Sequence, residues 1–105
     1  MKPLLFLLCL VSLTTQAAET EITLSIRDHR FVPAEVKVAA GQKVRLMVHN
    51  QDPTPEEFES YELNREKLIA PGASIGIYIG PLKPGRYPFF GDFNDKTAQG
   101  AVVVE

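Results

Sequence analysis

The stretch "FVPAEVKVAAGQKVRLMVHNQD", residues 31–52, alternates apolar and polar residues on both sides of a glycine turn. Successive side chains of a strand point to opposite faces, so the apolar residues Val44, Leu46 and Val48 would share one face. The segment "EVKV" before the turn has the same period of two. The stretch therefore predicts two strands, each with one buried face, connected through "AAGQ".

The same alternation recurs along the rest of the chain, between turns rich in proline, glycine, asparagine and aspartate. Further strands are predicted at "EITLSI" (21–26), "EFES" (57–60), "SIGIYIG" (74–80), "RYPFF" (86–90) and "GAVVV" (100–104). One stretch, "SYELNREKL" (60–68), could hold a helical turn. Short strands at regular spacing indicate an all-β fold, and we expect a Greek-key β-sandwich of about seven short strands.

The chain begins with "MKPLLFLLCLVSLTTQAAET", in which one lysine, a short apolar run and small residues follow one another. This order is typical of a cleavable signal peptide, and the apolar run is too short to span a bilayer. We expect cleavage after Ala17 or Ala18, with residues 1–18 as signal peptide and residues 19–105 as one periplasmic domain. The single cysteine, Cys9, would leave with the signal peptide, so the exported domain would have no thiolate ligand and no disulfide.

Charge and motifs narrow the class of function. The net charge of −2 becomes more negative when Lys2 is removed with the signal peptide. A nucleic-acid partner normally requires a basic face, so none is expected. No membrane span is expected in the mature chain. The hydrolase, metalloprotease and phosphate-binding motifs are absent, so we expect a binding protein, with assistance of ferrous iron oxidation left open.

Carboxylates gather in two short segments. Glu56, Glu57 and Glu59 stand in "NQDPTPEEFES" (50–60), and Asp92 and Asp95 stand in "GDFNDKT" (91–97). Like charges so close repel each other, more strongly where water is scarce. Alternation leaves a purely structural reading open, in which Glu57 and Glu59 face solvent and the aspartates form local turns.

The order of motifs resembles that of small periplasmic cupredoxins. In these proteins an F-x-P turn, a strand, a glycine turn and a V-x-L-x-V-x-N strand come in succession, as they do in residues 31–50. "APG", an alternating strand, "LKPGRYPFF" and "GAVVV" resemble the second half of the family. The resemblance covers Ile22 to Glu105 and implies a copper-binding end of the sandwich.

Carried over residue by residue, the resemblance places the first copper-ligating histidine at Glu56, the cysteine at Gly91 and the second histidine near Asn94, with no methionine following. Because a blue-copper site needs a thiolate, type-1 copper is not expected. Neither His29 nor His49 falls at a ligand position. Iron or copper remains open as the metal, and hard oxygen ligands favour iron, manganese, calcium or magnesium. The predicted metal ligands are Glu56, Glu57, Glu59, Asp92 and Asp95.

The succession "EEFE" also resembles the cupredoxin-like domains of EfeO-type iron uptake and of ferrous-iron transport operons. The resemblance implies an accessory component of bacterial iron uptake, with periplasmic or inner-membrane iron-transport proteins as partners. The alternative is a metal-free cupredoxin-like subunit with a structural or docking role in a membrane transport complex.

Overall fold

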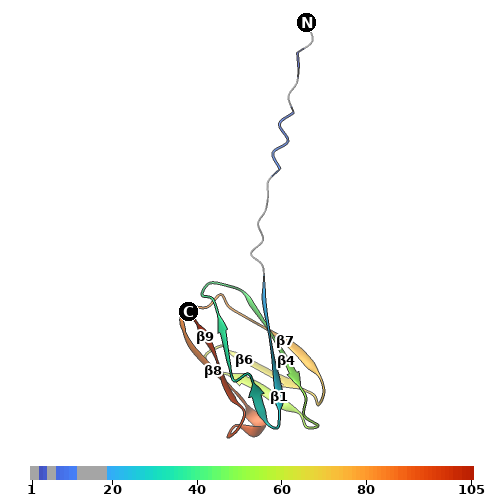
Figure 1. Ribbon diagram of the computed structural model, residues 1–105, viewed down its shortest axis with the longest axis vertical. Helices are drawn as coiled ribbons and strands as arrows, with labels where there is room; N and C mark the ends of the chain where they lie inside the picture. Colours follow the sequence, from blue (N-terminus) through green and yellow to red (C-terminus); the bar gives the residue numbers. More distant parts are fainter. Residues whose placement is uncertain (1–2, 5–6, 12–18) are drawn as a thin grey trace.

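The computed structural model describes residues 3–4, 7–11 and 19–105, and two β-sheets facing each other form the body of the molecule (Figure 1). The predicted cleavage point lies outside the described residues, so the signal peptide remains a prediction. No helix within the described ranges is long and apolar enough to cross a membrane.

The first sheet has four strands in the order β2-β1-β4-β7. Their bounds are β1 Thr20–Arg27, β2 Arg30–Val32, β4 Val44–Asn50 and β7 Ser74–Ile79. β1 runs parallel to β4, while β2 and β7 pair antiparallel at the two sides. The parallel pairing means that the chain crosses to the other sheet between β2 and β4.

The second sheet has five strands in the order β3-β9-β8-β5-β6. Their bounds are β3 Glu35–Val38, β5 Glu56–Ser60, β6 Arg65–Ile69, β8 Gly85–Gly91 and β9 Gln99–Val104. β3 and β9 are parallel, and the other pairs are antiparallel. One short 3-10 helix, η1 (Asp92–Asn94), follows β8 directly.

The all-β sandwich and the predicted strands are confirmed, but nine strands are present in the described residues instead of about seven. The additional strands are β2, which is three residues long, and β6, in which Ile69 alone is buried. Residues 60–68, which could have held a helical turn, form the end of β5, a turn and most of the strand β6 instead. A turn ending at Asn64, whose φ is 54°, reverses the chain into β6 along β5.

The core lies between the sheets and follows the alternation of the sequence. Val44, Leu46 and Val48 are fully buried from the first sheet. The rings of Phe58 and Phe89, from the second sheet, lie with centroids 4.9 Å apart, and the Phe31 ring packs edge-on against both. Edge-on and offset ring pairs are the favoured arrangements, so these rings fix the spacing of the sheets near one end.

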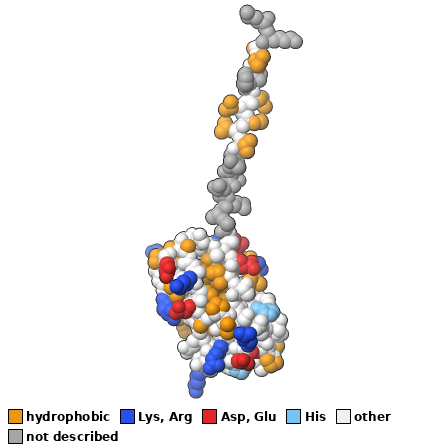
Figure 2. Space-filling model, viewed as in Figure 1, with side chains coloured by type: hydrophobic (Ala, Val, Ile, Leu, Met, Phe, Trp, Pro, Cys, Tyr) orange, Lys and Arg blue, Asp and Glu red, His pale blue; other side chains and the backbone are white. Residues whose placement is uncertain are grey.

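The surface carries charges of both signs. On the face shown in Figure 2, Lys and Arg side chains alternate with Asp and Glu side chains around a strip of hydrophobic ones. The two ion pairs of the described residues join Arg45 to Glu21 and Arg86 to Glu35. Both pairs are exposed, so each contributes little to stability.

Candidate functional site

The end of the sandwich that bears η1 lies away from the C-terminus (Figure 1). The buried amide of Asn50 organises this end: its nitrogen donates to the carbonyls of Thr54, Ile69 and Ala70, and its oxygen accepts from the Asp52 backbone N–H. Its side-chain bonds thus connect the end of β4, the 50–54 loop and the end of β6.

Asp52 continues this network on the other side. Its carboxylate accepts hydrogen bonds of 2.8 and 3.0 Å from the backbone N–H groups of Asp28 and His29. Both of these residues have positive φ, a conformation that non-glycine residues rarely adopt. The Asp52 carboxylate therefore stabilises the turn between β1 and β2, next to the candidate site.

Glu56, the first residue of β5, faces the core and is only 1% exposed. Its Oε1 accepts hydrogen bonds from the backbone N–H groups of Glu57, at 3.0 Å, and Phe93, at 2.9 Å. Its Oε2 accepts a bond of 2.7 Å from the Asn94 side-chain nitrogen. A buried carboxylate needs donors, and these three supply them.

Gly91, the last residue of β8, leaves the space that this carboxylate fills. A Cβ atom at position 91 would lie 2.6 Å from Glu56 Cδ and 2.8 Å from the Ala98 Cβ. Gly91 pairs with Phe58, two residues beyond Glu56 on β5, so the Glu56 side chain passes over Gly91 toward η1. Glu56, Gly91 and Asn94 are therefore neighbours in space.

Three other carboxylates meet outside the sandwich. Glu57, Glu59 and Asp92 each offer an oxygen, and these oxygens lie within 4.8 Å of one another. Glu57 and Glu59 alternate with Phe58, so they share the outer face of the second sheet, and Asp92 joins them from η1. We call these three residues the outer carboxylate cluster. The oxygens are close enough for one cation to contact all three.

Mutual repulsion alters the protonation of the outer carboxylate cluster. A hydrogen-bonding contact with the Glu66 carboxyl raises the pKa of Glu57, because it favours the neutral form, and burial and the nearby charges act in the same direction. Burial raises the pKa of Glu59, and the charges of Asp92 and Glu66 raise it further. The outer carboxylate cluster therefore carries negative charge that neighbouring positive groups do not neutralise.

Nearly the whole sequence matches the model of one protein family. Residues 2–104 match the model of the cupredoxin-like domain. The chain belongs to the cupredoxin-like domain family. A relative, an uncharacterized protein of Rickettsia prowazekii (strain Madrid E), is 52% identical over 84 residues, which are 80% of this chain and 67% of the relative.

Solved structures share the cupredoxin-like fold. The metal-binding domain of the Cu(I)-exporting P-type ATPase CopA of Streptococcus pneumoniae D39, solved with Cu(I), matches with a TM-score of 0.75 and 18% identity, over 86% of this chain and 89% of that one. Auracyanin A, a "blue" copper protein from Chloroflexus aurantiacus, matches with a TM-score of 0.73 and 13% identity, over 84% of this chain and all of that one. At such low identities the likeness concerns the fold alone.

Within this cupredoxin-like chain, the predicted site residues separate into three places. Glu56 lies inside the sandwich, and Glu57, Glu59 and Asp92 form the outer carboxylate cluster. Asp95 belongs to neither group. It lies at one end of a groove of about 540 Å³ along β8 and β9, where its backbone carbonyl accepts a bond from Gln99.

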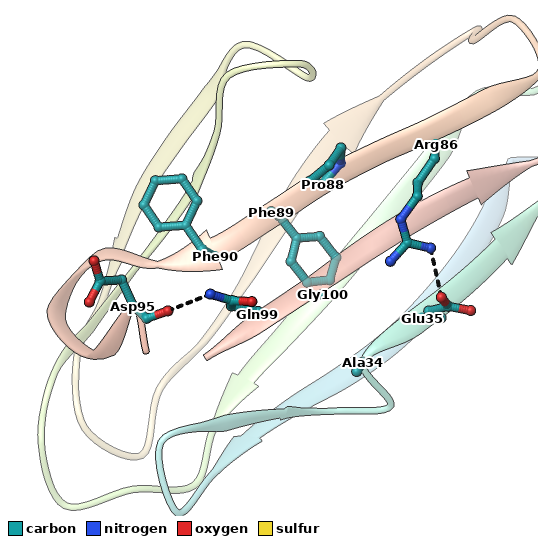
Figure 3. A pocket seen from close by; sticks show the side chains of 9 residues that line it. All are labelled: Ala34, Glu35, Arg86, Pro88, Phe89, Phe90, Asp95, Gln99 and Gly100. Carbon is teal, nitrogen blue, oxygen red and sulfur yellow. Dashed lines mark hydrogen bonds and ion pairs between the residues drawn. The ribbon is translucent and has the colours of Figure 1, made fainter. Parts of the chain in front are cut away.

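Figure 3 shows Phe90 at the same end of this groove as Asp95, and the ion pair between Arg86 and Glu35 near the other end. The pair is short, at 2.6 Å, and it lowers the pKa of Glu35 through the hydrogen bond and the charge of Arg86. The groove thus carries a fixed, compensated charge pair, in contrast to the outer carboxylate cluster.

Two residues near the site escaped prediction. Glu66 of β6 stands opposite Glu59 and adds a fourth carboxyl to the outer face. It would have been found had "REKLI" been predicted as a strand paired with "EEFES". The family resemblance puts a missing histidine near Asn94, whereas the structure shows that the Asn94 side chain donates a hydrogen bond to Glu56.

Proposed function

We propose that this protein is a periplasmic cupredoxin-like metal-binding protein, an accessory component of bacterial iron uptake, and that it binds iron or another hard cation at the outer carboxylate cluster. The observation that carries the proposal is the convergence of Glu57, Glu59 and Asp92 within 4.8 Å. The raised pKa values of Glu57 and Glu59 support it, because a bound cation would offset the repulsion that raises them.

The chemistry of the donors favours a hard ion. Carboxylate oxygens suit iron, manganese, calcium and magnesium, while soft thiolate ligands select Cu(I). The copper position implied by the family resemblance holds a carboxylate, a glycine and a carboxamide, from Glu56, Gly91 and Asn94. This donor set does not fit a type-1 copper ion, which needs a thiolate, so we place metal binding at the outer carboxylate cluster.

Metal titration tests the proposal. The purified domain is titrated with Fe(II), Fe(III), Mn(II) and Cu(II) by calorimetry, beside the variant Glu57→Gln/Glu59→Gln. We expect at least one hard ion to bind more tightly than about millimolar, corresponding to more than roughly 4 kcal/mol, and the variant to lose that binding. Equal binding by both proteins, or no binding by either, would contradict the proposal.

A matched control separates ligation from general charge effects. The variant Glu62→Gln/Glu105→Gln removes the same number of charges from two exposed residues outside the outer carboxylate cluster. It should bind the metal as the unmodified domain does. If it loses binding to the same extent as Glu57→Gln/Glu59→Gln, the ion is attracted by net charge and has no defined site.

The second candidate function is a metal-free docking subunit of a membrane transport complex. The observation in its favour is Phe93, which is 50% exposed on η1 at the end of the sandwich. The two functions differ in which variant impairs iron uptake by cells. Loss of uptake in Phe93→Ser, with uptake intact in Glu57→Gln/Glu59→Gln, favours docking, and the reverse result favours metal binding.

A further inference from the structure

We call Glu56, Gly91 and Asn94 the inner end of the site. Both oxygens of the Glu56 carboxylate have hydrogen-bond donors there. Gly91, which precedes η1, has no side chain with which to cap that helix. The Glu56 carboxylate, from another strand, accepts the Phe93 backbone N–H instead, and it accepts the Asn94 side chain with its second oxygen. One side chain of β5 thereby fixes the segment that follows β8.

We propose that the Glu56 carboxylate performs the structural role of a metal ion at this end of the sandwich, so that the end is closed and ordered without any metal. The copper ion that the family resemblance implies would join position 56 of β5 to position 91, the last of β8, and to the neighbourhood of position 94 after it. Glu56 makes the same connection through hydrogen bonds, using the space left free by the absence of a Cβ at Gly91.

Hydrogen bonds within the protein fix the conformation of the segment after β8. The Gly91 N–H donates to the Ala98 carbonyl at 2.8 Å, and the Ala98 N–H donates to the Asn94 carbonyl at the same distance. The Thr97 hydroxyl donates to the His29 carbonyl at 2.6 Å, which joins the segment to the turn after β1. With these bonds made, the Glu56 carboxylate completes the closure.

An ion entering here would meet a carboxylate whose acceptor sites are mostly occupied by donors already in place. Both oxygens of Glu56 are engaged, and the residue is buried. An ion that ligated Glu56 would compete with the Phe93 N–H and the Asn94 amide for the oxygens of this buried carboxylate, and a donor left without its acceptor is costly. The inner end should therefore stay closed while metal binds at the outer carboxylate cluster.

An exchange of amide and carboxylate tests this proposal. Asn94→Asp places a second carboxylate against Glu56. It should raise the equilibrium constant for unfolding roughly 10- to 100-fold, as measured by urea denaturation at neutral pH. Glu56→Gln/Asn94→Asp restores one amide and one carboxylate, and should recover most of that loss. Asn64→Asp, the same change in an exposed turn, is the control and should have little effect. A double variant no more stable than Asn94→Asp alone overturns the proposal.

Hydrogen exchange gives a second, local measurement. In Glu56→Ala, the amide proton of Phe93 should exchange at least about tenfold faster than in the unmodified chain, because its acceptor is gone. Glu57→Ala removes a carboxylate from the opposite face of the same strand and should leave Phe93 unchanged. Unchanged exchange at Phe93 in Glu56→Ala would show that the carboxylate does not hold this segment.

Metal addition completes the test, independently of whether the outer carboxylate cluster binds iron. The variant Glu57→Gln/Glu59→Gln is mixed with Zn(II) or Cu(I), and the amide resonances of Phe93 and Asn94 are followed. They should not move, and exchange at Phe93 should stay slow. A saturable shift of these resonances would show that an ion enters the inner end, and would overturn the proposal even where the proposed function holds.

Discussion

The Glu56 side chain of β5 fills the space that a side chain at Gly91 of β8 would need: a Cβ at position 91 would lie 2.6 Å from Glu56 Cδ. Gly91→Ala is therefore expected to destabilise the domain by about 1–3 kcal/mol through overpacking. Urea denaturation measures this loss. The control is Gly76→Ala in β7, where the Cβ would meet the flexible Arg45 side chain at 2.9 Å, and which should cost less.

The same contact predicts coupling between the two positions. Removing the Glu56 carboxylate by Glu56→Ala vacates part of the space that a Cβ at position 91 needs. The cost of Gly91→Ala should be smaller in that background, although the Ala98 Cβ, 2.8 Å away, still opposes it. Strictly additive costs in a double-mutant cycle would mean that Glu56 does not occupy this space.

The pH dependence of stability should reveal the outer carboxylate cluster. The pKa values of Glu57 and Glu59 are raised above the ordinary 4.5, so these groups favour the folded state below that pH and oppose it as pH rises through their folded pKa values. Thermal unfolding measured from acid toward neutral pH should show this contribution being lost. Glu57→Gln should weaken the pH dependence and raise the melting temperature at neutral pH.

Glu35 provides a contrast of opposite sign. Its pKa is lowered by Arg86, so its contribution to stability is present above the ordinary value of 4.5 and lost as pH falls through its folded pKa. Glu35→Gln should lower the melting temperature slightly at neutral pH and leave it unchanged in strong acid. Because the pair is exposed, added salt should shrink the effect.

Asn50 should be far more sensitive to substitution than its neighbours. Asn50→Ala leaves the carbonyls of Thr54 and Ile69 and the Asp52 N–H without their side-chain partner, and should cost about 3 kcal/mol in urea denaturation. Gln51→Ala, an exposed neighbour, is the control and should cost little. A similar small cost for both would show that solvent replaces the lost hydrogen bonds.

The strands that sequence could predict are those whose burial follows the period of the backbone. Val44, Leu46 and Val48 alternate with partly exposed residues, so the position of β4 could be predicted from the residue types. The same alternation along "EEFES" puts Glu56 on the side of Phe58, and both are buried. β6 could not be predicted from the sequence because it is an edge strand with one buried residue, which leaves no alternation to detect. Its pairing with β5 stabilises it.

The partners of the candidate site depend on contacts between distant segments. Alternation indicates that Glu57 and Glu59 share a face, but only the course of η1 brings Asp92 to them and leaves Asp95 at the groove. The fit of the Glu56 carboxylate against Gly91 likewise arises from the register between β5 and β8. A pattern read along one strand carries no information about such a register.

The position of β9 between β3 and β8 has a consequence for how this protein folds. β3 is made early, yet its pairing partner in the second sheet is β9, so it has no neighbour there until residues 99–104 have been synthesised. Closing the long loop between β3 and β9 costs entropy before this pair gains any pairing energy, so the pairing of β3 is slow. β5 can pair earlier with β6, its neighbour in the sequence, so β3 joins the second sheet late in folding.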